Sequence, residues 1–189
     1  MPDADVSILR GFVAPRDDTA MMQALMEQTP WRQEPVTIYG KVYQQPRLCA
    51  LYGDAGLRYD YSGLRLDPLP WTAALRDIKH RVEDRTQTRF NTVLLNLYRD
   101  QNDSMGFHSD DERELGPEPA IASLSLGATR VFRLKHKTDR ALPVQKIALE
   151  SGTLLLMKGL TQHKWKHGIN KQSEACGPRI NLTFRTLYG

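Results

Sequence analysis

The chain has 189 residues, of which 40% are hydrophobic and 25% charged, and its formal net charge is +4. These values are ordinary for a soluble globular protein with a substantial core. Its apolar runs are too short to cross a membrane, its N-terminus lacks the pattern of a signal peptide, and its two cysteines, Cys49 and Cys176, have no metal-site spacing. We therefore expect a monomer without membrane association in a reducing compartment, the cytoplasm or, in a eukaryote, the nucleus.

The charge is distributed unevenly along the chain. Residues 1–128 carry 14 Lys and Arg against 19 Asp and Glu, whereas residues 129–189 carry 12 Lys and Arg against only 3 Asp and Glu. A basic C-terminal part indicates either a polyanionic partner or a solvated basic face without further consequence.

The N-terminal part predicts one helix followed by short strands. An acidic stretch after Pro15 leads into residues 19–28, whose apolar side chains recur at helical spacing. The segments 36–43, which turns near its Gly, 48–52 and 57–63 have the composition of strands.

Residues 36–66 are rich in tyrosine and in basic side chains. Aromatic rings stack on unpaired bases and cations bind phosphates, so the composition suits a nucleic-acid surface, although tyrosine is also common in ordinary strands. The tyrosines are Tyr39, Tyr43, Tyr52, Tyr59 and Tyr61, and the cations are Lys41, Arg47, Arg58 and Arg65.

The second half predicts one more helix and then mainly strands. A helix is expected from Pro70-Trp71 to about Gln87. Strands are expected at 91–98, 120–126, 130–135, 144–149, 153–158 and 179–185. Many short strands after a few helices predict an α+β fold, mainly β, with a sandwich or jelly-roll core.

The last of these strands alternates without interruption. Arg179, Asn181, Thr183 and Arg185 share one face, and apolar residues occupy the other. The simplest interpretation is an edge strand with its polar side in water. Two arginines four residues apart would equally suit a small dicarboxylate, because guanidinium binds carboxylate through paired hydrogen bonds.

The stretch 106–112 contains a candidate metal site. His108 and Asp110 lie two residues apart, so on extended backbone their side chains project from the same face. One imidazole and one carboxylate are two of the three ligands of the facial triad that holds non-haem Fe(II). The third would be a later histidine, with His167 the first candidate and His163 the second.

In combination, several motifs carry a resemblance to a known family. They are residues 52–57, Asn96-Leu97-Tyr98, the His-x-Asp-Asp-Glu of residues 108–112, residues 121–128, and Arg179-x-Asn181-x-Thr183-x-Arg185. With them the sequence resembles the AlkB-type Fe(II)/2-oxoglutarate dioxygenases, which remove alkyl groups from nucleic-acid bases, and is most similar to the subgroup that acts on DNA. The resemblance runs from about residue 36 to the C-terminus.

The resemblance implies a double-stranded β-helix (jelly roll) with N-terminal helices and a nucleotide-recognition lid. Residues 1–35 would be an N-terminal extension with one helix, 36–66 the lid, and 67–189 the dioxygenase core with a supporting helix, all within one structural domain. The implied cofactors are Fe(II), 2-oxoglutarate as co-substrate, and O2.

The resemblance also assigns residues to the site. It implies that His108, Asp110 and His167 bind iron. Arg179, helped by Tyr98 and Asn181, would bind the distal carboxylate of 2-oxoglutarate. Asn96 and Arg185 would secure its metal-proximal end, and Thr183 would line the pocket.

For the substrate, the family implies alkylated DNA, single or double stranded, with 1-methyladenine and 3-methylcytosine as typical lesions. Tyr61 would stack on the extruded base, and Tyr59, Asp111 and Glu112 would contact the base or its sugar-phosphate. Tyr39 occupies the finger position, where an apolar wedge is expected. Candidates for phosphate contacts are Lys135, Lys137, Arg140, Lys164 and Lys166.

Three alternatives remain open from the residues. The same chemistry could act on RNA or on a protein side chain. The chain could be a non-catalytic nucleic-acid-binding module whose His and Asp are incidental. A zinc hydrolase is the third reading, but zinc hydrolysis gives no use for the paired arginines.

Overall fold

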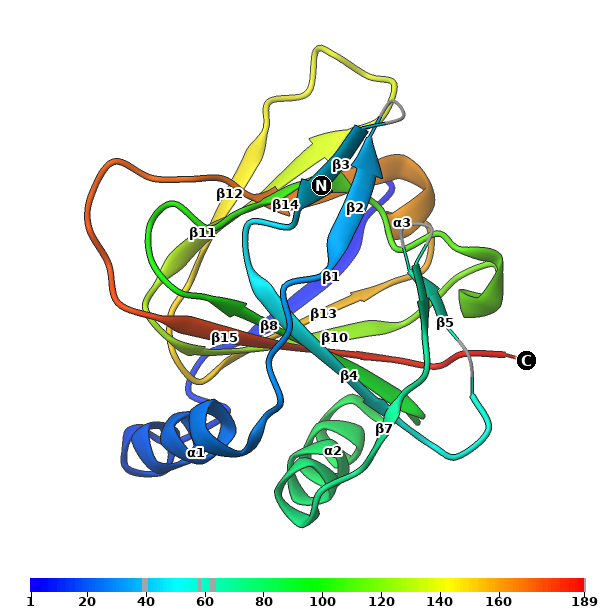
Figure 1. Cartoon of the computed structure of the whole chain (residues 1–189). Coiled ribbons are helices and arrows are strands. Elements are labelled where there is room, and N and C mark those ends of the chain that lie inside the picture. Colours follow the sequence, from blue (N-terminus) through cyan, green and yellow to red (C-terminus); the bar gives the residue numbers. More distant parts are fainter. Residues whose placement is uncertain (39–40, 58, 62–63, 189) are drawn as a thin grey trace.

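The computed structural model describes residues 1–189 except 39–40, 58, 62–63 and 189, and describes only the backbone of 36–38, 59–61 and 64–66. Two sheets face each other, and two helices pack on the outer side of the larger sheet (Figure 1). No helix within these described ranges is long and apolar enough to span a bilayer.

The larger sheet has seven strands and runs through the middle of the molecule. Its spatial order is β1 (Asp5–Leu9), β13 (Thr153–Lys158), β10 (Ile121–Gly127), β15 (Arg179–Arg185), β8 (Thr92–Tyr98), β4 (Leu48–Gly53) and β7 (Leu69–Pro70). All neighbours are antiparallel except β4 and β7. Strands distant in sequence are therefore neighbours in space, as a jelly roll requires.

The smaller sheet covers the inner face of the larger one. It contains β12 (Gln145–Leu149), β11 (Arg130–His136), β14 (Trp165–Ile169) and β9 (Met105–His108), in that order. Two further pairs of strands form separate hairpins, β2 (Pro35–Ile38) with β3 (Lys41–Gln44) and β5 (Tyr59–Tyr61) with β6 (Leu64–Leu66). The predicted jelly roll is thus confirmed.

Two long helices support the larger sheet. They are α1 (Pro15–Gln28) and α2 (Ala73–Thr86), while α3 (Thr161–Lys164) and a 3-10 turn (Arg113–Leu115) are single turns. The α2 helix begins where the Thr72 hydroxyl accepts a hydrogen bond from the Leu75 amide, an N-cap that satisfies one free N–H. Leu75, Ile78 and Val82 then form the apolar side of α2 that packs on the sheet.

Two apolar layers hold the fold together. One lies between the helices and the larger sheet and includes Leu124, Leu182 and Phe184. The other lies between the two sheets and includes Phe132 and Trp165. The polar side chains of β15 must therefore point between the sheets, because its apolar side chains pack on the helix side.

Several elements were not predicted from the sequence. β1, β9 and β14 are short, and residues 5–9 read as a tail although they pair along the whole of β13. β4 falls within the predicted lid range, yet it pairs along its length with β8 in the main sheet. Strands of four to six residues carry little periodicity of their own, and long-range pairing decides their place.

Glu83 gives a test of how this core depends on pH. Its carboxylate is buried and accepts hydrogen bonds from the Phe90 amide (2.8 Å) and Arg89 Nη1 (3.1 Å), with Lys79 Nζ at 3.4 Å. Burial acts to raise the pKa of Glu83, but these partners outweigh it and bring the pKa below its usual 4.5. The ionised form therefore stabilises the fold above pH 4.5, and this stabilisation is lost as the pH falls through the lowered pKa.

We expect Glu83→Gln to lower the free energy of unfolding by about 1–3 kcal/mol at pH 7. Urea denaturation of both proteins between pH 7 and pH 3 measures the difference, which should shrink below pH 4.5. A difference that stays constant across this range would contradict the role of the charge.

Candidate active site

Three potential metal ligands converge between the sheets. His108 ends β9, His167 lies in β14, and the antiparallel pairing of these strands puts the two residues directly opposite each other. Asp110 follows two residues after His108. Its carboxylate oxygens lie 3.9 Å from His108 Nε2 and 3.8 Å from His167 Nε2, and the three ligand atoms lie within 4.8 Å of one another.

Both imidazoles are oriented toward this point. His108 Nδ1 lies 2.9 Å from the Gly106 carbonyl, and a carbonyl can only accept, so Nδ1 carries the proton and Nε2 keeps its lone pair. The His167 ring stacks on Phe132 at 5.3 Å and contacts His108 at 4.3 Å between ring centres. The hydrogen bond to Gly106 thus orients the His108 ring, and packing against Phe132 orients the His167 ring.

Asp110 is held by two hydrogen bonds. Its amide donates to Gln162 Oε1 (2.9 Å), and its Oδ1 accepts from Arg185 Nη2 (2.8 Å). Oδ2 is buried and has no hydrogen-bond partner among the described residues. A buried carboxylate oxygen without a partner is costly unless a cation binds there.

The protonation states suit a metal. Burial acts to raise the pKa of Asp110, but Arg185 and the two histidines lower it to about 2. Burial lowers the pKa of His167 to about 3 and also lowers that of His108. At neutral pH the cluster therefore contains one carboxylate and two neutral imidazoles, the ligand set of a facial Fe(II) site with open positions. These residues fit such an ion.

A buried arginine lines the same pocket. Arg179 is 1% exposed, and its Nη2 donates to Ser125 Oγ (2.9 Å) and Asn181 Oδ1 (2.8 Å). Its Nε and Nη1 have no hydrogen-bond partner in the described part of the chain, and its guanidinium lies 5.1 Å from the centre of the Tyr98 ring. Burial lowers the pKa of Arg179, partly offset by Tyr98, but an arginine stays charged at neutral pH.

This geometry points to a carboxylate ligand. A buried guanidinium whose Nε and Nη1 have no partner among the described residues requires an anion, and a carboxylate can accept a charge-assisted hydrogen bond from it. The edge-strand interpretation of residues 179–185 is therefore wrong: β15 lies between β10 and β8, and its polar face is enclosed by the smaller sheet. The residues around the pocket are Asn96, Tyr98, Met105, His108, Asp110, Ser123, Phe132, Met157, His167, Gly168, Ile169, Arg179, Asn181, Thr183 and Arg185.

The other predicted co-substrate residues also lie in this lining. Asn96 Oδ1 accepts from Arg47 Nε at 2.7 Å, and Asn181 Nδ2 donates to Thr183 Oγ1 at 2.7 Å. Arg185, expected at the metal-proximal end of 2-oxoglutarate, forms its ion pair with Asp110. Arg185 thus holds Asp110, one of the predicted metal ligands, in position.

The predicted substrate residues are only partly described. Tyr39 lies outside the described residues, and for Tyr59 and Tyr61 only the backbone, in β5, is described. Asp111 pairs with Lys137 at 2.8 Å. Glu112 is half-buried, burial raises its pKa, and its Oε2 has no hydrogen-bond partner within the described ranges.

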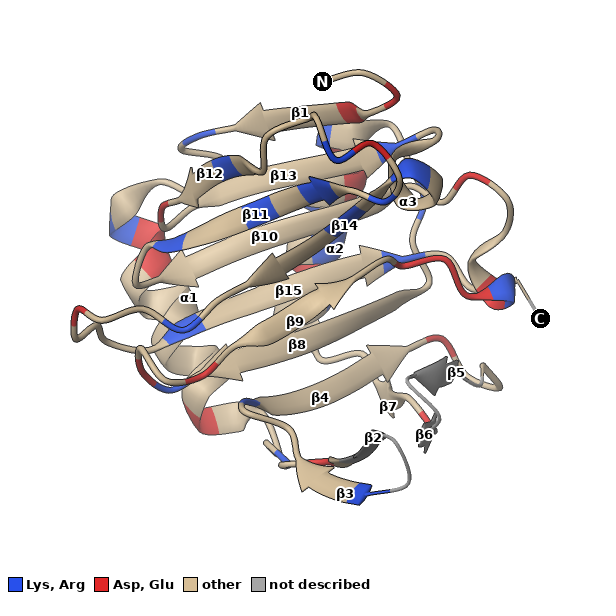
Figure 2. Ribbon diagram, turned by 90° about the horizontal axis from the view of Figure 1, so that it is seen from above, with Lys and Arg blue, Asp and Glu red and all other residues tan. Residues whose placement is uncertain are grey.

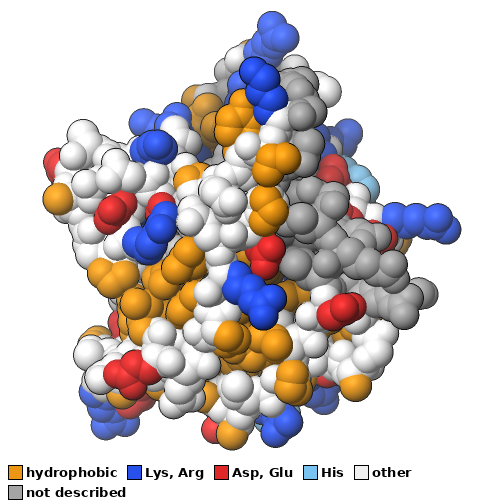
Figure 3. Space-filling model, in the orientation of Figure 1, with side chains coloured by type: hydrophobic (Ala, Val, Ile, Leu, Met, Phe, Trp, Pro, Cys, Tyr) orange, Lys and Arg blue, Asp and Glu red, His pale blue; other side chains and the backbone are white. Residues whose placement is uncertain are grey.

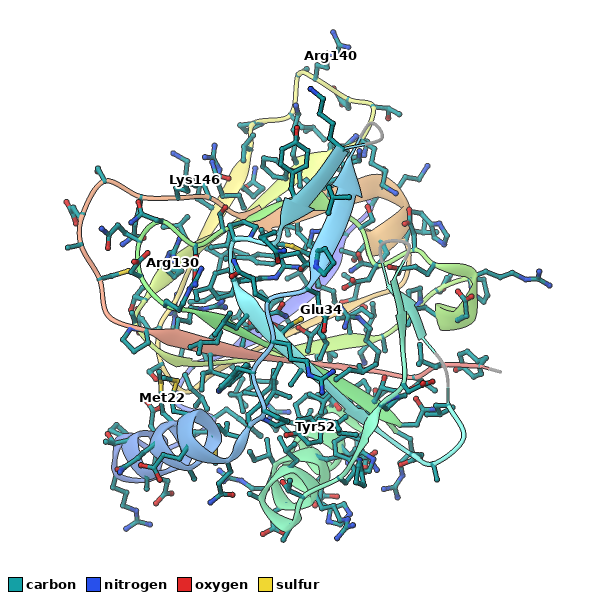
Figure 4. All side chains as sticks on the ribbon, in the orientation of Figure 1. Met22, Glu34, Tyr52, Arg130, Arg140 and Lys146 are labelled. Atoms are coloured by element: carbon teal, nitrogen blue, oxygen red, sulfur yellow. The ribbon has the colours of Figure 1, made fainter. Side chains whose placement is uncertain are left out.

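Other sequence candidates lie elsewhere. His163 contacts the Pro117 carbonyl and is not part of the metal-ligand cluster. Arg47 and Tyr52, counted with the nucleic-acid surface, are buried, whereas Tyr43 is exposed (Figure 4 labels Tyr52). Composition alone did not separate structural residues from surface residues in this segment.

Sequence reasoning missed three polar residues that line or support the site. Ser123 and Ser125 lie on β10 directly opposite Thr183 and Asn181, and their hydroxyls bond Asn181 and Arg179. Their alternation with leucine in residues 121–127 was a usable sign of a polar inner face. Gln162 is fully buried beneath Asp110, and nothing in the local sequence distinguishes it.

Comparison with known proteins gives one consistent family. The profile of the 2OG-Fe(II) oxygenase superfamily matches residues 5–185. The human "Alpha-ketoglutarate-dependent dioxygenase alkB homolog 3" is 42% identical over 97% of this chain and 66% of its own length. The mouse "DNA oxidative demethylase ALKBH2" is 43% identical over 80% of this chain and 66% of its own length. The chain thus spans about two thirds of the length of these curated relatives.

Two further matches extend over nearly the whole chain. The "DNA oxidative demethylase ALKBH2" of Arabidopsis thaliana is 32% identical over 97% of this chain and 67% of its own length. The solved structure described as "The structure of OsALKBH1" superposes with a TM-score of 0.69, covers 96% of this chain and 97% of its own, and is 18% identical, which shows a shared fold. These matches, together with the geometry of the site, show that the chain belongs to the 2OG-Fe(II) oxygenase superfamily and to its AlkB-type branch.

Proposed function

We propose that this chain is an Fe(II)/2-oxoglutarate-dependent dioxygenase that repairs DNA by oxidative demethylation of N-alkylated bases. One observation carries the proposal. The His108, Asp110 and His167 cluster and the two free N–H donors of Arg179 line the same pocket. A metal site beside a carboxylate site suits a reaction that consumes a keto diacid.

The chain's own residues would hold and orient the reactants. His108, Asp110 and His167 would bind Fe(II), and Arg179 would bind the distal carboxylate of 2-oxoglutarate. When bound, Fe(II) would supply the activation of O2: one oxygen atom enters the succinate formed as 2-oxoglutarate loses CO2, and the other enters the N-methyl group. The resulting N-hydroxymethyl group leaves as formaldehyde. The apolar residues of the pocket, such as Phe132, exclude water from this chemistry.

The substrate class rests on three considerations. The relatives named as DNA oxidative demethylases are 32–43% identical to this chain. Its C-terminal part is strongly basic. A methyl group on a base-pairing nitrogen also prevents pairing, so a lesion such as 1-methyladenine or 3-methylcytosine costs less to extrude into a pocket. Asp111 and Glu112, next to the metal cluster, would favour such a cationic base.

A side-by-side assay tests the substrate. Purified protein is incubated with Fe(II), 2-oxoglutarate and O2, and with methylated DNA, methylated RNA or a methylated peptide. We expect formaldehyde and succinate in equal amounts from methylated DNA, single or double stranded. Turnover of RNA alone or of peptide alone would show that the same reaction acts on that substrate and not on DNA. Oligonucleotide binding without any oxidation would indicate a non-catalytic module.

The finer organisation is part of the same proposal. The two hairpins within residues 36–66 would form the nucleotide-recognition lid, whereas β4, between them in the sequence, pairs with β8 in the main sheet. The protein would act as a monomer, in the cytoplasm or, in a eukaryote, in the nucleus. Light scattering of the purified protein, with and without a methylated oligonucleotide, measures its molar mass and so tests whether it is a monomer.

The choice between the two histidines gives a further prediction. We expect His163→Ala to retain bound metal, because His163 lies outside the cluster, and His167→Ala to lose it. Elemental analysis after loading with Fe(II) or Mn(II) under anaerobic conditions measures the metal content. Loss of metal from His163→Ala but not from His167→Ala would reverse the assignment.

A further inference from the structure

The outer face of the smaller sheet carries two like-charged pairs. Lys135 on β11 lies directly opposite Lys166 on β14, and Arg133 on β11 lies directly opposite Lys146 on β12. The residues that alternate with them on β11 are buried, so these cations project away from the pocket. Like charges directly opposite each other on neighbouring strands destabilise a sheet. A cost repeated twice on one face indicates a role outside folding.

No carboxylate among the described residues pairs with these cations. The strands β9, β11, β12 and β14, all described in full, contain no Asp or Glu. None of the four cations takes part in an ion pair with any described residue. Figure 2 shows basic positions on β11, β12 and β14, and Figure 4 shows Lys146 projecting from β12.

An aromatic ring adjoins the cations. Arg133 lies opposite Gly168 on β14, and because Gly168 has no side chain, the guanidinium reaches across that strand to the Phe107 ring on β9, 6.0 Å from its centre. Phe107 is 36% exposed. An added Cβ at Gly168 would lie 2.7 Å from the Met105 carbonyl, so the close approach of β14 and β9 also requires glycine there.

We propose that Arg133, Lys135, Lys146, Lys166 and Phe107, the basic face, bind the nucleic-acid strand that flanks the base in the pocket. The inference rests on the proposed function and adds a second contact surface to it. Cations would neutralise phosphates without reading sequence, and the Phe107 ring would stack on an unpaired base. Figure 3 shows further basic side chains at the end of the molecule that is farthest from α1 and α2, so the positive charge continues beyond the sheet.

The basic face is connected to the pocket. Phe107 and His108 are neighbours on β9, with Phe107 exposed and the His108 ring in the pocket lining, so a single strand separates the two sites. At the end of β11, Lys137 pairs with Asp111, which adjoins Asp110. A strand whose modified base enters the pocket can therefore continue onto the sheet without leaving the protein surface.

Two double variants test this surface. In Arg133→Ser/Lys146→Ser and in Lys135→Ser/Lys166→Ser, we expect affinity for a 25-nucleotide methylated single strand to fall on the order of tenfold at moderate salt. The slope of log affinity against log salt should fall by about 1.4 in each, because each lost phosphate contact removes about 0.7. Phe107→Ala should weaken binding by about fivefold or more and leave the slope unchanged. The three lysines are exposed and Arg133 is half-buried, and each double change also removes a like-charged pair, so the fold should be retained.

Matched controls separate this idea from non-specific charge. Arg76→Ser/Arg85→Ser removes the same charge from exposed positions on α2, and we expect its affinity and salt slope to equal those of the wild type. A methylated trinucleotide has only one nucleotide on each side of the modified base, so kcat on it should be unchanged in the two double variants. If the wild type turns over no methylated nucleic acid, the proposed function fails.

Two results would overturn the inference while leaving the proposed function intact. One is unchanged affinity and slope of both double variants on the 25-nucleotide strand, with normal turnover of the trinucleotide. The other is loss of binding to a poly-glutamate peptide with unchanged oligonucleotide affinity, which would assign the basic face to an acidic protein partner.

Discussion

His108→Ala and Asp110→Ala should each lose bound metal and reduce turnover by at least about 1,000-fold. Each change removes one of three donors that lie within 4.8 Å of one another, and the described residues offer no other carboxylate or imidazole in that cluster. The two variants differ in stability. Asp110 accepts from the buried Arg185, so Asp110→Ala leaves a buried guanidinium without its carboxylate and costs about 3–5 kcal/mol.

His108→Ala therefore gives the cleaner result, and Asp110→Asn serves as a second variant that keeps an oxygen for Arg185. Ser109→Ala is the matched control, because Ser109 lies between the two ligands in the sequence and its hydroxyl donates to the Trp165 carbonyl at 3.0 Å. Metal content, thermal unfolding and the yields of succinate and formaldehyde are measured for all four. Wild-type yields from His108→Ala or Asp110→Ala would refute the ligand assignment.

Arg179→Ala should raise the concentration of 2-oxoglutarate needed for half-maximal turnover by about 100-fold, with little effect on oligonucleotide binding. The reason is that the buried Arg179 guanidinium still has donors without a partner among the described residues, and a carboxylate that binds there gains charge-assisted hydrogen bonds. Arg179→Lys keeps the charge but not the fork of donors, so it should recover only part of the affinity.

The measurement is turnover against 2-oxoglutarate concentration at saturating methylated DNA, together with oligonucleotide affinity measured separately. Arg113→Ala, which removes an exposed arginine from the 3-10 turn, is the control for a change of charge alone. Equal losses in 2-oxoglutarate requirement and in oligonucleotide affinity would show that Arg179 acts through the general charge of the protein and not as a carboxylate site.

Some features of this protein follow from local sequence. His108 and Asp110 are two residues apart, and extended backbone brings side chains at that spacing to one face wherever the segment lies in the fold. The alternation of residues 179–185 likewise separates four polar side chains from three apolar ones before any tertiary contact is known. The two helices and most of the strands are predicted for the same reason, since their periodicity spans only a few residues.

Other features depend on contacts between distant segments. The pairing of β14 with β9 selects His167 over His163, and the position of β15 between β10 and β8 buries the polar face that an edge strand would leave in water. Gln162 supports Asp110 across 52 positions of sequence. Local periodicity determines which face of a strand a residue occupies, but only long-range register determines which other residue that face meets. The sequence by itself therefore determined the ligand types and a mainly β sandwich or jelly roll, and the tertiary structure decided which of the candidate donors lie together.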